Sequence, residues 1–364
     1  MLGALLPLAR VLLDPFGTLP GDELGDVYKH AWAFWHATVS PGLWTEYLNA
    51  PDGGLLFDVM WLPSRLAAPL TWVTGAVFAC NVFVWLSLVL VGLCTWAAAR
   101  DLSDRPWAPI CAGLLAQTAP FLLGYPLYSG VYERLAVWVF PLLLLGLSRV
   151  AERGDVRWSL VCALGLGAAA SGCQVYGVYA VMQIGVMLPW LLWRARRERH
   201  LLRLLATLAL LAAVLTGLAA LTIWAAQHPM SLAPQEHRES LGLGPRAAEV
   251  EWGRLGLMLD PTQARTQPLV LSGDRLAKTQ YLGWVPLILG LVGAAWDRRP
   301  RVLLGVGLGL TAAVVSLGPL DGWNLLNIAA MWTVPALGSQ PNTWQLLALF
   351  SPLCALGVAA LLDR

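Results

Sequence analysis

Long runs of apolar residues with almost no charge constrain this chain more than any other feature of its sequence. Of its 364 residues, 57% are hydrophobic and only 13% are charged, whereas soluble domains carry about 25% charged residues. Uncharged apolar runs of about 18 residues or more are typical of helices that cross a bilayer. The sequence therefore predicts an all-α fold, a polytopic bundle of transmembrane helices that forms a single membrane domain over 1–364.

About ten spans are expected, each an apolar segment followed by a polar break. Their ranges are 1–13, 76–99, 107–121, 135–148, 158–172, 176–193, 204–226, 281–296, 302–317 and 343–362. The first is short for a span and contains Arg10, so only a partial helix is expected there. The segment GVGLGL at 305–310 lies inside a span, where its glycines indicate close helix packing.

Lysine and arginine are concentrated in the short connections between these spans, which hold more than half of the 24 basic residues. Short basic loops stay in the cytoplasm. Both ends of the chain are therefore expected inside, and two long connections, 14–75 and 227–280, outside. This arrangement predicts a multi-pass protein of the inner (cytoplasmic) membrane with its active side extracytoplasmic.

The two long outer connections contain aromatic runs that are compatible with helices lying flat at the headgroup level. These are YKHAWAFWHA at 28–37 and EVEWGRLGLML at 249–259, and the stretch 66–75 is also expected at the interface. The six cysteines all fall in apolar segments without a CxxC pair, so they are expected to be free core residues.

The stretch GDELGDVYKH at 21–30 collects charged residues at helical spacing. Asp22 and Asp26 are four residues apart, and Lys29 and His30 follow Asp26 by three and four. Such residues share one face of a helix. One interpretation is a solvated helix cap, and the other is a carboxylate that faces the headgroup of a lipid-borne substrate.

Three segments carry a resemblance to a known family: PGDELGDVYKHAWAFW, then NAPDGGLLFDVMWLPSR and the span after it, then PFLLGYPLYSGVYERLAVWVF. Over about 18–200 the chain resembles the first half of bacterial integral membrane proteins of the glycosyltransferase C superfamily, which includes polyprenyl-phosphate-sugar-dependent mannosyltransferases and arabinosyltransferases. The resemblance implies transfer of a sugar from a polyprenyl-phosphate donor to an extracytoplasmic lipid or glycan acceptor. It implies Asp22 as the general base or acceptor-orienting group, and Asp26 as the second acid.

Such a transfer requires a base for the acceptor hydroxyl and cations for the departing phosphate. The outer cations that fit are Lys29, Arg65 and Arg134. Two further breaks are candidates for lining the cavity, SGVYERLAVW at 129–138 and SGCQVYGVY at 171–179. The expected substrate-binding residues are Lys29, His30, Arg65, Glu133, Arg134, Gln174 and Tyr176.

Several alternatives stay open at this stage. No HExxH, Walker or Cys/His ligand pattern is present, so neither a cofactor nor a metal site is expected, and a divalent cation is not indicated. A net charge of +2 does not favour nucleic acid as a partner. Membrane lipids are expected partners. Near 339–343, where relatives carry arginines, this chain is neutral, which favours a truncated or reduced member. The alternative functions are a non-catalytic glycosyltransferase-like partner and a lipid or solute transporter or flippase.

Overall fold

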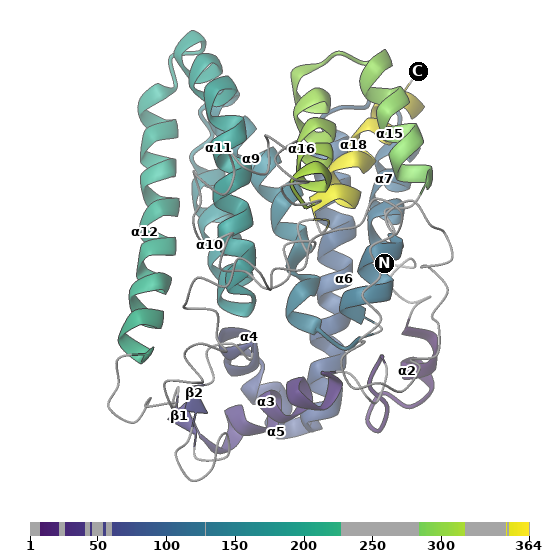
Figure 1. Cartoon of the computed structure of the whole chain (residues 1–364), viewed down its shortest axis with the longest axis vertical. Helices are drawn as coiled ribbons and strands as arrows, with labels where there is room; N and C mark the ends of the chain where they lie inside the picture. The colour runs from purple at the N-terminus through teal and green to yellow at the C-terminus, as the bar shows by residue number, and fades with distance from the viewer. Residues whose placement is uncertain are drawn as a thin grey trace, which may run out of the picture.

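The computed structural model describes residues 8–21, 26–40, 44–45, 54–55, 60–127, 129–226, 284–316, 347 and 349–363. The described chain is almost entirely helical, and its helices stand side by side in a bundle (Figure 1). One short antiparallel pair departs from this pattern, β1 (Trp44–Thr45) with β2 (Gly54–Leu55). The predicted all-α membrane fold is confirmed.

A layer of short helices lies at the lower end of the bundle in Figure 1. It contains α3 (Val27–Val39), α4 (Trp61–Leu66) and α5 (Ala68–Thr74), and α2 (Ala9–Leu13) lies in the same half. Helix α3 confirms the helix expected over 28–37, and α5 falls in the stretch expected at the interface. The other expected outer helix, 249–259, lies outside the described residues.

Each expected span from the second onward coincides with a described helix. These helices are α6 (Ala76–Arg100), α7 (Trp107–Gln117), α9 (Val139–Arg153), α10 (Arg157–Gly172), α11 (Gln174–Arg197), α12 (Leu201–Ala226), α15 (Trp284–Trp296), α16 (Pro300–Ser316) and α18 (Phe350–Leu362). Five described segments are long and apolar enough to cross a membrane: 76–100, 107–127, 132–153, 174–197 and 201–221. Of the first expected span, only residues 8–13 are described.

The chain between α7 and α9 is less regular than the sequence predicts. Helix α7 ends at Gln117, and α8 (Pro120–Leu122), a π-helix η3 (Leu123–Leu127) and a 3₁₀ helix η4 (Tyr132–Trp138) follow. Proline cannot donate its backbone nitrogen to a helix and disfavours a helical residue before it, so Pro120 separates α7 from α8. The chain then leads into α9 through η4, a 3₁₀ helix, and not through a continuous α-helix.

The last described helix, α18, lies in the core and packs against α6, α7, α15 and α16. Glycines allow the close approach. A Cβ on Gly305 would lie 2.9 Å from Leu356 Cδ1, and one on Gly309 would lie 2.9 Å from Cys354 Sγ. The packing role predicted for 305–310 is confirmed. The six cysteines are free, as expected.

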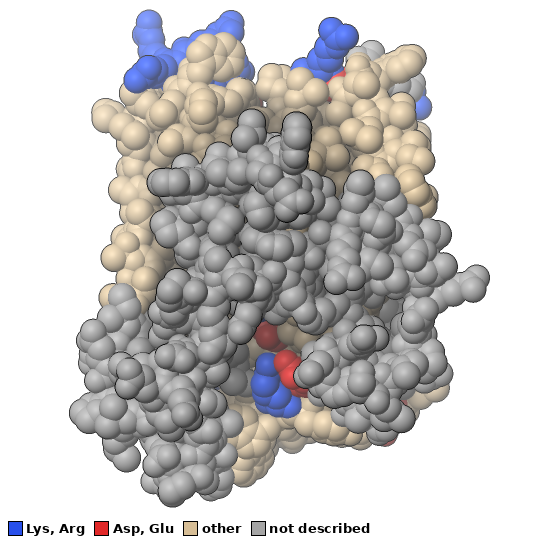
Figure 2. Space-filling view, viewed as in Figure 1, with Lys and Arg blue, Asp and Glu red and all other residues tan. Residues whose placement is uncertain are grey.

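The short basic connections lie together at the end of the bundle opposite α3, where blue side chains project at the top of Figure 2. Ion pairs join several of them. Asp101, after α6, accepts hydrogen bonds from Arg149 Nη2 at 2.7 Å and Arg301 Nη1 at 3.0 Å. Asp363, after α18, accepts from Ser103 Oγ at 2.7 Å. The distribution of charge between the two ends follows the predicted pattern, and the orientation in the membrane stays a prediction.

Candidate functional site

The candidate site forms where the first turn of α3 meets the turn before η4. The Asp26 backbone N–H donates to the Ser129 carbonyl at 3.1 Å. Beside it, Gly130 has φ +68°, and a Cβ there would lie 2.7 Å from the Val27 nitrogen. Both facts require glycine at this position, because other residues rarely adopt this conformation and would collide with α3. This close approach brings α3 against η4.

Four ionisable side chains meet at this junction. Lys29 Nζ lies 2.7 Å from Asp26 Oδ2 and 3.9 Å from Glu133 Oε1, and His30 Nε2 lies 2.8 Å from Glu133 Oε2. Figure 2 shows acidic and basic side chains together low on this face, where α3 lies in Figure 1. We call Asp26, Lys29, His30 and Glu133 the junction cluster. The helical spacing predicted for its first three members is confirmed.

Burial and charge act in opposite directions on Lys29. Burial by itself lowers the pKa of the ammonium group, whereas the carboxylates of Glu133 and Asp26 raise it, and the net effect is a pKa above the ordinary value. Lys29 therefore stays protonated at neutral pH. It holds a fixed positive charge between the two carboxylates.

His30 is fully buried, and its Nε2 lies 2.8 Å from Glu133 Oε2. The Tyr132 backbone N–H donates to the same Nε2 at 3.3 Å. The Nδ1 atom of His30 has no hydrogen-bond partner among the described residues. The pair thus fixes Glu133 in place and leaves one ring nitrogen available.

Arg134 follows Glu133 but points to different partners. Its Nη1 lies 2.9 Å from Cys173 Sγ, and its guanidinium lies 5.9 Å from the centre of the Tyr176 ring. The Tyr176 hydroxyl donates to the Arg134 carbonyl at 2.7 Å. Within the described part of the chain, Arg134 forms no ion pair with a carboxylate, and its buried Nε has no partner. A thiol is a weak acceptor, so this cation is weakly compensated.

Buried tyrosines surround Arg134. Tyr176 stacks at an angle against Tyr179, with ring centres 6.0 Å apart, and both rings are almost fully buried. The Tyr179 hydroxyl has no hydrogen-bond partner among the described residues. A buried hydroxyl without a partner is costly, so this group is suited to donate to, or accept from, a bound molecule.

Among the predicted substrate-binding residues, Arg65 lies away from the junction cluster. Arg65 Nη1 donates to the Ala37 carbonyl at 3.3 Å and also contacts the Ser40 carbonyl. Ala37 is eleven residues after Asp26, roughly 16 Å along the helix axis, so these contacts place Arg65 at the far end of α3. Gln174 is exposed and forms no side-chain hydrogen bond with described residues. Asp22, the predicted base, lies outside the described residues.

Sequence reasoning missed two contributors, Cys173 and Tyr132. Cys173 lies in an apolar segment, where a lone cysteine predicts core packing. Tyr132 supplies a ring 5.1 Å from His30 and a hydroxyl bonded to the Pro20 carbonyl. In the sequence, Tyr132 was marked only by its position next to Glu133. Both contacts depend on tertiary structure that no local pattern records.

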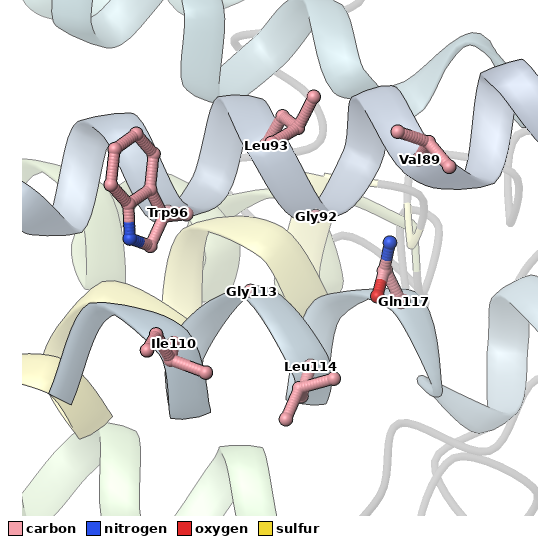
Figure 3. Close-up of a pocket in the computed structure, with 8 residues that line it drawn as sticks. All are labelled: Val89, Gly92, Leu93, Trp96, Ile110, Gly113, Leu114 and Gln117. Carbon is pink, nitrogen blue, oxygen red and sulfur yellow. The ribbon is translucent and has the colours of Figure 1, made fainter. Parts of the chain in front are cut away.

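A pocket lies between α6 and α7, lined by residues outside the junction cluster. It has a volume of about 210 Å³, and its lining includes Gly92, Trp96, Gly113 and Gln117 (Figure 3). The Gln117 amide donates to the Leu88 carbonyl at 2.9 Å. No lining residue is titratable, so this pocket offers no acid–base chemistry.

No family model matches the sequence, and no curated protein matches it. Among solved structures it is similar to the archaeal oligosaccharyltransferase AglB from Archaeoglobus fulgidus in complex with an inhibitory peptide and a dolichol-phosphate. The identity is 12% and the TM-score 0.47, over 99% of this chain and 49% of that one. For the apo form of the Archaeoglobus fulgidus oligosaccharyltransferase the identity is 13% and the TM-score 0.48, over 98% of this chain and 49% of that one. The chain spans about half the length of these two proteins.

Proposed function

We propose that the protein is a membrane glycosyltransferase that moves a sugar from a polyprenyl-phosphate donor to a lipid or glycan acceptor. The observation that carries the proposal is the junction cluster beside the weakly compensated Arg134. Carboxylates and cations stand next to each other there, at the end of the bundle opposite the basic connections. This combination is what the resemblance to glycosyltransferases of the C superfamily leads us to expect.

The carboxylates supply the base in this proposal. Asp26 Oδ2 accepts from Lys29, while Oδ1 has no hydrogen bond with described residues and the side chain is 41% exposed. That oxygen is available to an acceptor hydroxyl. Glu133 is a weaker candidate for the base, because its carboxylate oxygens already contact Lys29 and His30. Asp22 stays our first choice for the base, with Asp26 as the second acid that orients the acceptor or holds Lys29.

The cations bind the donor phosphate in this proposal. Arg134 suits the role because its guanidinium lacks a carboxylate partner in the described region and its fork matches a phosphate group. Lys29 is less available, since it already contacts Asp26. The phosphate leaves with the electron pair of the glycosidic bond, and a fixed positive charge stabilises it.

The test is an assay with radiolabelled polyprenyl-phosphate sugars on wild type, Asp22→Asn and Asp26→Asn. The amide keeps the shape of the carboxylate and removes its basicity. Loss of the base should reduce turnover by about 10² to 10⁴ without changing donor binding. We expect this loss for Asp22→Asn and a smaller one for Asp26→Asn.

The rival functions give different results in the same assay. A dead Asp26→Asn with a fully active Asp22→Asn would move the assignment of the base from Asp22 to Asp26. Wild type that binds donor without transfer would favour a non-catalytic partner. Donor movement across a vesicle membrane without transfer would favour a flippase.

A further inference from the structure

Several arginines at the basic end of the bundle, near α6, α9 and α16, are paired within the protein. Arg149 and Arg301 bind Asp101, Arg301 also binds Glu152, and Arg299 binds Asp297. At the α11–α12 connection the balance differs, because it carries several arginines and one acid.

The α11–α12 connection is a tight turn that projects its arginines outward. The Glu198 N–H donates to the Arg194 carbonyl at 3.0 Å and the His200 N–H to the Ala195 carbonyl at 2.7 Å. Glu198 pairs with Arg194 at 3.2 Å. Arg196, Arg197 and Arg199 are exposed and have no side-chain hydrogen bond or ion pair with described residues. We call these three the hairpin arginines.

Apolar surface continues from these charges along the two helices. Trp193 is 52% exposed and lies under the Arg197 guanidinium, 5.7 Å from it. On α12, Leu202 is 82% exposed. Only 17% of the most apolar α12 window is buried, against 83% for Tyr132–Arg153, and α12 stands at the edge of the bundle in Figure 1. Cations above an open apolar face match the two parts of an anionic lipid.

We propose that the hairpin arginines bind the phosphate headgroup of an anionic phospholipid, whose acyl chains lie along Trp193 and the exposed face of α12. Charge complementarity selects this occupant, since a zwitterionic headgroup would add no net attraction to three uncompensated cations. The alternative role, stabilising the carbonyl end of α11, requires no lipid. The proposal is independent of the glycosyltransferase function.

The experiment titrates the purified full chain, held in phosphatidylcholine and detergent, with phosphatidylglycerol, and counts bound lipids by native mass spectrometry. Arg196→Gln/Arg197→Gln is compared with Arg100→Gln/Arg298→Gln, which removes the same charge from exposed positions at the end of α6 and between α15 and α16. Each hairpin arginine should raise the selectivity for phosphatidylglycerol roughly fivefold. Selectivity for phosphatidylglycerol should therefore fall about thirtyfold in the first variant and stay near wild type in the second.

Three results would overturn the proposal. An equal loss of selectivity in both double variants would mean that the overall positive charge at this end attracts the lipid and that there is no specific site. Unchanged selectivity in Arg196→Gln/Arg197→Gln would mean that these arginines do not bind the lipid. Displacement of the lipid by inorganic phosphate would mean a site for free phosphate. If the hairpin variant does not fold, the salt dependence of the wild-type protein tests the proposal. Selectivity for phosphatidylglycerol that persists in high salt would contradict an electrostatic site.

Discussion

Arg134 differs from the other site cations in what it touches. Lys29 is paired with Asp26, and Arg65 is occupied with backbone carbonyls of α3. Arg134 instead contacts a thiol, and the buried atom Nε has no partner in the described part of the chain. Arg134 therefore keeps a buried donor, Nε, that a bound molecule could use.

Replacing Arg134 should weaken donor binding. Arg134→Ala removes a charge-assisted hydrogen bond, which costs about 1.5 to 3 kcal/mol. Arg134→Lys should recover part of this, because the charge survives and the planar fork does not. The measurement is the dissociation constant of a polyprenyl-phosphate sugar for the three proteins.

A matched control is Arg157→Ala, which removes an exposed arginine from the opposite end of the bundle. It should bind donor as wild type does. Equal donor affinity in wild type, Arg134→Ala and Arg134→Lys would leave Arg134 as a packing residue only.

How far a single site residue can be predicted depends on how far away its partner is in the sequence. Asp26, Lys29 and His30 share a face because a helix repeats every 3.6 residues, and local spacing contains that information. The pairing of His30 with Glu133 joins positions 103 apart, and Arg134 with Cys173 joins positions 39 apart. Such pairs are set by how α3, η4 and α11 pack, so the sequence predicted His30, Glu133 and Arg134 but neither their contacts nor the part played by Cys173.

At the scale of elements, the contact between α15 and α18 depends on glycine. A Cβ on Gly293 would collide with the Gly357 carbonyl. Gly293→Ala should force the two helices apart and cost about 1 to 3 kcal/mol of stability, the range for overpacking a core. Thermal unfolding of the purified protein in detergent measures it.

Gly307, in the middle of α16, is the control for this prediction. No atom lies within 4 Å of a Cβ built there. Gly307→Ala should therefore be neutral or stabilise the protein by up to about 1 kcal/mol through helix propensity. If both variants lost the same stability, close packing at Gly293 would not be the cause.

Helices were the easiest elements to predict, because a long apolar run is a one-dimensional property. The structure has helices over all the described ranges predicted from the second span onward. The failure came between α7 and α9, where a single expected break became α8, η3 and η4. The expected span ran on to residue 121, past Pro120, and no local pattern selects a π-helix or a 3₁₀ helix, which tertiary contacts stabilise.

At the scale of the whole molecule, Asp101 links three distant parts of the chain. Burial by itself raises the pKa of this carboxyl, but hydrogen bonds and charge from Arg149 and Arg301 hold it below its ordinary value. A pKa that is lower in the folded state adds stability above the unfolded value of 3.8, and that stability is lost as the pH falls through the folded value. Asp101 should therefore make the bundle sensitive to acid.

Asp101→Asn tests this sensitivity. At neutral pH it should cost about 3 kcal/mol, because Arg149 loses its carboxylate partner. The difference in unfolding midpoint between wild type and the variant should shrink below pH 3.8. Asp104→Asn, at an exposed position nearby, should show no such dependence. A difference that stays constant as the pH falls would contradict the assignment.

Orientation across the membrane is a separate prediction, made from charge alone. In a chain without its native cysteines, single cysteines at positions 24 and 250 should react with an impermeant maleimide on intact cells. A cysteine at position 198, among the arginines of the α11–α12 connection, should not react. Labelling at position 198 alone would invert the topology and move the junction cluster to the cytoplasmic side.

The central place of α18 bears on how the bundle is assembled during synthesis. Helices α9, α10, α11 and α12 contact one another, so they can associate as soon as the ribosome has made them. Helix α18 is inserted much later, yet it packs against α6 and α7 as well as α15 and α16. Until it arrives, those four helices lack a shared packing partner, so we expect this long-range closure to be a late step in assembly.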